Sequence, residues 1–255
     1  NVVNLDDIKV EKKVGGGIQN SELIKGIVLD KERVHSGMPK KIKEAKVALV
    51  DGAIEIKSTE TDAKISINDP SQLQGFVDQE EIILKKMVED VKNSGANVLV
   101  CQKGIEDIAQ YYLAKEGIYA VRRVKQSDME KLAKAVGGKI VNKVNELNAD
   151  NLGKAGVVEE IKVGDEEMTY VKDCENPKAV TFLIRGGTQH VVDEVERAVS
   201  DALGDVVATL KDGKAVGGAG APEIEVAKGL KEYANSLSGR EQLAVNAFAE
   251  TMEII

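Results

Sequence analysis

A glycine-rich stretch, GKAVGGAGAPE at residues 213–223, contains the residues best suited to bind an anion. Gly217, Gly218 and Gly220 can adopt backbone angles that a side chain would forbid, and Pro222 suits the start of a helix because it has no N–H group. Backbone amides at a helix N-terminus bind phosphate readily. From the pattern alone a tight turn is the favoured interpretation, because neither a dinucleotide fingerprint nor a Walker loop is complete.

Asp201 is the acidic residue of greatest interest. It lies in a stretch whose apolar residues have helical spacing, and Arg197 precedes it by four residues. The pattern therefore favours a solvated i,i+4 ion pair rather than a catalytic group.

Histidine and cysteine offer little for catalysis or metal binding. His35 and His190 have no second ligand at metal spacing, and Cys101 and Cys174 lie far apart and outside any CxxC motif. We predict no metal site; we interpret both histidines as structural and both cysteines as small core or surface thiols. The cysteine usage favours a reducing compartment.

Composition excludes several classes of function. The chain has 255 residues, of which 42% are hydrophobic, and a formal net charge of −8, so it has no basic field for nucleic acid or anionic lipid. There is no apolar run of membrane-spanning length and no leader-like segment, which predicts a cytoplasmic protein. Because it begins at Asn1 and ends on apolar residues, we expect a piece of a longer polypeptide.

Helices and strands alternate through the middle of the chain. The predicted elements are strand 98–101, helix 105–115, strand 118–121, helix 128–136 and strand 139–141. Ser127 and Glu130 have the spacing of a capping box. This alternation predicts an α/β layer with a parallel sheet, followed by strands 157–163 and 168–171 around a turn at Gly164-Asp165.

Two long helices flank this region. The first is predicted to begin after Asp69-Pro70 and to stop at Ser94-Gly95, with a bent or looped tip because Gly75 interrupts it. The second is predicted to begin with Thr188 as its N-cap, after a strand at 180–184 and a hinge-like break at 185–187.

Long runs of the sequence resemble one family, the group II chaperonins of archaea, or thermosomes. The runs that carry this resemblance are LDKERVHSGMPKKI, NDPSQLQGF, SGANVLVCQKGIEDIAQYYLAK, AVRRVKQSDMEKLAKA, AVTFLIRGGTQHVVDEVERAVSDAL, DGKAVGGAGAPE and YANSLSGREQLAVNAFAE. The resemblance spans nearly the whole chain.

The resemblance implies an α/β chaperonin apical domain, layered and with a helical protrusion, plus a partial intermediate domain and a partial all-α equatorial segment. The implied boundaries are 1–28 and 179–212 for the intermediate domain, 29–178 for the apical domain with a lid at about 56–92, and 213–255 for the equatorial segment. The apical domain would bind unfolded polypeptide and close the chamber. Its implied polypeptide-binding and lid residues are Leu73, Phe76, Val77, Tyr111 and Tyr112.

The resemblance also gives Asp201 a role, because the aspartate of the family's D-A-L run orients the water that attacks the terminal phosphate of ATP. The family's glycine run contacts the nucleotide, which carries over to Gly217, Gly218 and Gly220. Ala219 replaces one of the usual glycines. The family's GDGTT-like phosphate loop and its magnesium ligands do not occur in these residues.

Three hypotheses follow for this chain. The first is a polypeptide-binding chaperonin piece without ATPase activity of its own, whose intact subunit binds ATP or ADP with magnesium and assembles with other subunits into a double ring. The second is a nucleotide-using α/β enzyme with a glycine-rich cofactor loop, which requires a strand leading directly into that loop. The third is a purely structural ring subunit.

Overall fold

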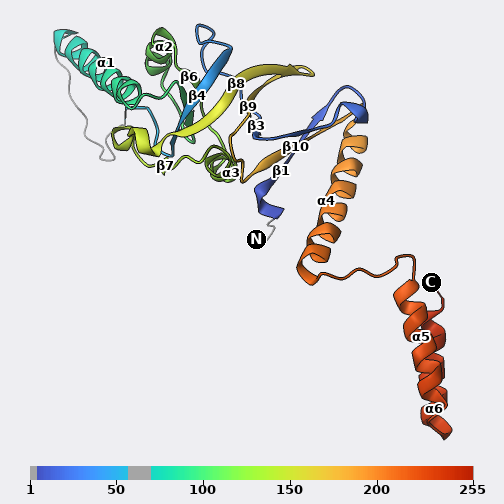
Figure 1. The fold of residues 1–255 in the computed structure, drawn as a ribbon. Coiled ribbons are helices and arrows are strands. Elements are labelled where there is room, and N and C mark those ends of the chain that lie inside the picture. Colours follow the sequence, from blue (N-terminus) through green and yellow to red (C-terminus); the bar gives the residue numbers. More distant parts are fainter. Residues whose placement is uncertain (1–4, 57–69, 255) are drawn as a thin grey trace. The chain divides into compact units, whose positions relative to one another are not determined.

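The computed structural model describes residues 5–56 and 70–254, with the backbone alone for residues 70–77. The described residues form two compact units, one that ends at Asp201 and one that runs from Ala202 towards the C-terminus. Figure 1 shows the elements of both units.

The first unit is built around a seven-stranded sheet of order β3-β9-β8-β4-β5-β6, in which β7 also pairs with β4. The strands are β3 (Ile27–Leu29), β4 (Lys41–Val50), β5 (Val98–Cys101), β6 (Tyr119–Val121), β7 (Ile140–Val141), β8 (Gly153–Val163) and β9 (Glu166–Lys172). Strands β4, β5 and β6 pair in parallel, which confirms the predicted parallel sheet. Strands β8 and β9 form an antiparallel hairpin around the predicted turn.

Three helices cover the two faces of this sheet: α1 (Pro70–Asn93), α2 (Asp107–Lys115) and α3 (Gln126–Val136). Successive side chains of a strand point to opposite faces. Val47 and Leu49 of β4 therefore join the core that α3 covers, while Ala48 and Val50 join the core that α1 and α2 cover. The result is a three-layer α/β arrangement (Figure 1).

A smaller three-stranded sheet of order β1-β10-β2 lies in the same unit. Strand β1 (Ile8–Val14) runs parallel to β10 (Val180–Gly186), and β2 (Glu22–Ile24) runs antiparallel to β10. The sheet therefore joins the first residues of the chain to a strand far along the sequence.

Helix α4 (Gln189–Asp212) follows β10, begins in the first unit and ends in the second. Thr188 is its N-cap as predicted, because the Thr188 hydroxyl accepts a hydrogen bond of 3.4 Å from the Val191 amide. The second unit continues with α5 (Ala221–Ala234) and α6 (Gly239–Met252), which pack against each other. Alanines on both helices are fully buried, as their sequences predict.

Three local predictions were wrong. Helix α1 runs unbroken through Gly75, so the cost of one glycine, about 1 kcal/mol, is outweighed by the rest of the helix. Helix α3 begins at Gln126, before the expected Ser127 cap, and its N-cap Lys125 makes no side-chain capping bond. Arg185 belongs to β10 rather than to a hinge.

Both cysteines are buried and free, and burial raises the pKa of each thiol to about 11. In the unfolded chain these thiols ionise near pH 9, so the unfolded state releases protons first. The stability gained by keeping these buried thiols protonated is fully present below pH 9, and it is lost as the pH rises towards 11. We expect the free energy of unfolding to fall by on the order of 1–2 kcal/mol per thiol between pH 8 and 10.5. Urea titrations should show this fall, and a Cys101→Ala/Cys174→Ala variant with an equal fall would contradict it.

Candidate functional site

The predicted residues fall into two groups: a nucleotide group, Asp201 and the glycines, and a polypeptide-binding group on α1 and α2. Asp201 closes the first unit, and the glycines belong to the second.

Asp201 lies on α4, with 66% of its side chain exposed. Arg197 contacts its Oδ2 atom through NH1 at 3.0 Å, which confirms the predicted i,i+4 ion pair. Arg197 also binds Glu194, and these hydrogen bonds lower the pKa of the Glu194 carboxyl. Asp201 is thus a solvent-accessible carboxylate with one exposed cation beside it, and such pairs are weak.

The glycine loop leads into α5 as predicted, with Gly220 as a left-handed N-cap (φ 81°) and Pro222 in the first turn. Gly218 has no atom within 4 Å of the place where a side chain would begin, so its backbone is open to approach. Ala219 also has a positive φ of 55°, a conformation that costs an L residue about 1 kcal/mol or more. The alanine that departs from the family pattern therefore stands where glycine is favoured.

The polypeptide-binding group centres on two adjacent tyrosines of α2. Tyr111 is 54% exposed, and its ring meets those of Tyr112 and His35 edge-on, with centroid distances of 5.4 and 6.4 Å. His35 therefore packs as a structural side chain, with its Nδ1 accepting a 3.0 Å hydrogen bond from the Gly37 amide. Tyr111 is left with an accessible aromatic surface.

Tyr112 is held from α1. Its hydroxyl donates a hydrogen bond to Glu81, and the Lys85 ammonium lies 4.9 Å from the centre of its ring. Lys85 also pairs with Glu81 at 2.9 Å, and hydrogen bonds from Lys85 and Tyr112 lower the pKa of Glu81. These contacts hold the Tyr112 side chain in place, while Tyr111 remains 54% exposed.

A groove runs between α1 and α2 beside these tyrosines. It is lined by Lys85, Val88, Glu89, Lys92, Tyr112, Lys115 and Glu116. Ile82, which is 63% exposed, precedes Lys85 by three residues and Glu89 by seven, so it lies on the same face of α1. The groove thus combines an aromatic wall with charges of both signs, and the exposed Ile82 lies on the same face of α1.

Sequence reasoning did not find Ile82 or its exposed neighbour Ile83, because apolar residues on an amphipathic helix are expected to pack. Leu73, Phe76 and Val77 lie on α1, but their side chains are outside the described part, as are residues 57–69 of the predicted lid. Within residues 5–56 and 70–254, no three side chains of metal-binding type gather into a possible site. In the same part of the chain, no helix is long and apolar enough to cross a bilayer.

The described residues thus combine a layered α/β unit with an α-helical unit. The sequence matches the TCP-1/cpn60 chaperonin family over residues 1–255, and the chain therefore belongs to that family. It is 59% identical to thermosome subunit beta of Methanothermobacter thermautotrophicus and 58% identical to a thermosome subunit of Methanopyrus kandleri. These alignments cover 99% and 100% of this chain but 47% of each relative.

A solved structure supports the same assignment. The open-state monomer of a group II chaperonin from Methanococcoides burtonii is similar with a TM-score of 0.72 and 46% identity, over 98% of this chain and 56% of that one. The resemblance to thermosomes is thereby confirmed, together with the α/β chaperonin fold class. The chain spans about half the length of the curated relatives it matches.

Proposed function

We propose that this chain is the polypeptide-binding and chamber-closing part of an ATP-driven group II chaperonin subunit. The observation that carries the proposal is the accessible surface of Tyr111 beside the α1–α2 groove, on a chain that belongs to the chaperonin family. Exposed aromatic and aliphatic side chains around a groove suit unfolded polypeptide, which presents the same groups.

The remaining roles follow the family and are proposed with it. The subunit assembles with other subunits into a double ring in the cytoplasm and uses ATP with magnesium. Asp201 orients the attacking water, and Gly217, Gly218 and Gly220 bind the nucleotide through backbone amides at the start of α5.

The domain boundaries are also proposed as stated: 1–28 and 179–212, 29–178, and 213–255. Their support is that β1 and β2 of the first segment pair with β10 of the second in one sheet. A cofactor enzyme is disfavoured, because α4 rather than a strand precedes the glycine loop.

The client-binding proposal predicts that the purified 255-residue chain binds a chemically denatured test protein. Tyr111→Ser and Ile82→Ser should each weaken this binding about tenfold, because each removes an accessible apolar anchor worth about 1–2 kcal/mol. Fluorescence anisotropy of a labelled client measures the affinity. Tyr233→Ser is the matched control, because Tyr233 is equally exposed on α5 of the other unit. Equal losses in all three variants, or no binding by the chain, would contradict the proposal and favour a purely structural subunit.

A further inference from the structure

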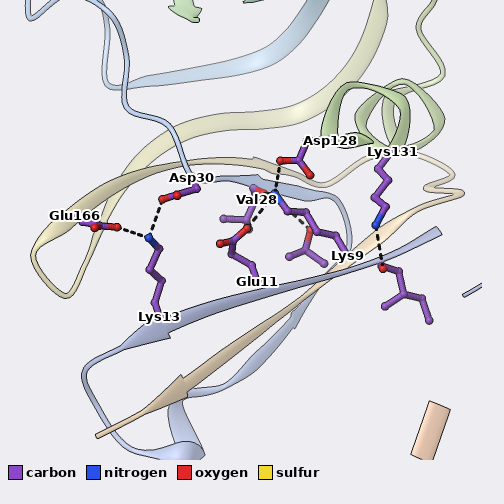
Figure 2. A network of polar contacts seen from close by, with 10 residues as sticks. Lys9, Glu11, Lys13, Val28, Asp30, Asp128, Lys131 and Glu166 are labelled. Atoms are coloured by element: carbon purple, nitrogen blue, oxygen red, sulfur yellow. Dashed lines mark hydrogen bonds and ion pairs between the residues drawn. The ribbon is translucent and has the colours of Figure 1, made fainter. Parts of the chain in front are cut away.

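Lys9 of β1 is a buried lysine at the contact between the two sheets, with only 5% of the residue exposed. Its Nζ atom donates a hydrogen bond of 2.7 Å to the Val28 carbonyl, and it lies 3.0 Å from Asp128 and 3.1 Å from Glu11 (Figure 2). Lysine is almost never buried unless it is paired. The three partners belong to β3, α3 and β1, so one ammonium group joins three elements.

The backbone of Val28 is the group that Lys9 binds on β3. Among the strands that the structure describes, β3 is at the edge of the seven-stranded sheet and pairs with β9 alone. Val28 is fully buried, so its unpaired backbone groups need partners from elsewhere. The Val28 amide donates to the Thr181 hydroxyl at 3.1 Å, and its carbonyl accepts from Lys9. Lys9 and Thr181 are direct cross-strand partners on β1 and β10.

The rest of the contact between the sheets is modest. A small apolar cluster crosses it, made of Ile24, Val28, Val163, Met168, Tyr170 and Leu183. Lys13 pairs with Asp30 at 2.8 Å and with Glu166, but both carboxylates are more than half exposed. Burial by itself lowers the pKa of Lys13, and its hydrogen bonds to these two acids outweigh that effect and raise it. Exposed pairs of this kind contribute little, so Lys9 and Thr181, which are 5% and 0% exposed, form the buried polar attachment between the sheets.

We propose that Lys9 and Thr181 form a latch that closes the β3 edge and makes the two sheets move as one body. With the latch open, each sheet keeps its own strand pairing. The Val28 amide loses Thr181, the Val28 carbonyl loses Lys9, and the sheets separate. The role of the latch in the subunit rests on the proposed function. Because α4 follows β10 directly, a movement of α4 would move the three-stranded sheet, and the latch would transmit that movement to the seven-stranded sheet and its polypeptide-binding surface. The latch itself requires neither nucleotide nor client.

The test is hydrogen–deuterium exchange on the purified 255-residue chain carrying Lys9→Met, which keeps the length of the side chain and removes its charge. We expect amides of β3 and of the β2–β3 connection to exchange about tenfold faster or more, while β4 and β5 keep their protection. Thr181→Val removes the second partner and should accelerate the same amides. Lys131→Met is the matched control, because Lys131 makes a long contact of 3.4 Å with the Ile8 carbonyl on the same strand (Figure 2).

A distance measurement separates a latch from general stabilisation. Spin labels at Gln19→Cys and Lys43→Cys, exposed positions associated with the two sheets, should give a narrow distance distribution that broadens with Lys9→Met. Uniformly faster exchange in all elements would overturn the proposal, because Lys9 would then only add global stability. Unchanged exchange at β3 or an unchanged distribution would overturn it as well. Since no client or ATP is used, these results are independent of the proposed chaperonin activity.

Discussion

Asp201→Ala is expected to slow ATP hydrolysis about 100-fold or more and to change nucleotide affinity less than about threefold. The carboxylate is proposed to position the attacking water, an interaction that matters in the transition state and little in the bound ground state. Because the chain spans about half of its relatives, we would test it in a chimaera. Residues 1–255 would replace the matched segment of thermosome subunit beta from Methanothermobacter thermautotrophicus, which is 59% identical.

The control for this prediction is Arg197→Met in the same chimaera. It removes the cation that contacts Asp201 at 3.0 Å but leaves the carboxylate in place, so turnover should change less than about threefold. Phosphate release and nucleotide titration measure the two quantities. Unchanged turnover with Asp201→Ala would remove Asp201 from the site. The 255-residue chain alone is expected to hydrolyse no ATP, and turnover by it that Asp201→Ala abolishes would contradict a divided site.

The alternating core of the fold could be predicted because local and tertiary preferences agree there. Strand β5 is a run of apolar residues that ends as predicted at Cys101, and Gly137 ends α3 in the left-handed conformation that glycine favours. The turn at Gly164 likewise follows from local chemistry, since its φ is 68°. Where local sequence preference and tertiary packing favour the same structure, that structure can be predicted from the segment's own sequence.

The wrong predictions arose where a local signal was outweighed. Gly75 lowers helix propensity, yet α1 continues through it because the cost of one residue is small beside a helix of 24 residues. In α3 the side-chain amide of Gln126 donates a hydrogen bond of 3.0 Å to the Glu130 carboxylate. Glu130 therefore binds a side chain one turn earlier in the helix and does not form the capping box predicted with Ser127. Neither outcome has a signature in the spacing.

The sequence carried different amounts of information about Asp201, the glycine loop and Lys9. Asp201 has only an ion-pair pattern, and its proposed role comes from the family resemblance. Lys9 gave no signal at all, because Lys9, Glu11 and Lys13 alternate as in a solvated strand, and their burial depends on α3 and β3, which are distant in sequence. That the glycine loop leads into a helix, with Gly220 at its N-cap and Pro222 in its first turn, was predicted from the conformational preferences of glycine and proline alone.

Gly26→Ala is expected to destabilise the first unit by about 3 kcal/mol or more. Gly26 has a φ of 150°, and a β-carbon placed there would lie 2.0 Å from the Val171 carbonyl oxygen of β9. That oxygen is part of the backbone, so the contact cannot be relieved by a side-chain rotation. The substitution therefore combines an unfavourable backbone conformation with a steric clash at the edge of the seven-stranded sheet.

The position of Gly26 makes the effect larger than that of an ordinary turn. Only Lys25 and Gly26 connect β2 of the three-stranded sheet to β3 of the seven-stranded sheet, so relief of the clash must move β3 away from β9 or strain the connection. Urea unfolding followed by circular dichroism measures the loss. Gly187→Ala in the same unit, where no atom lies within 4 Å, should change stability by less than about 0.5 kcal/mol. Equal stability of the two variants would mean that the sheets tolerate separation at β3, which would also weaken the case for the Lys9 latch.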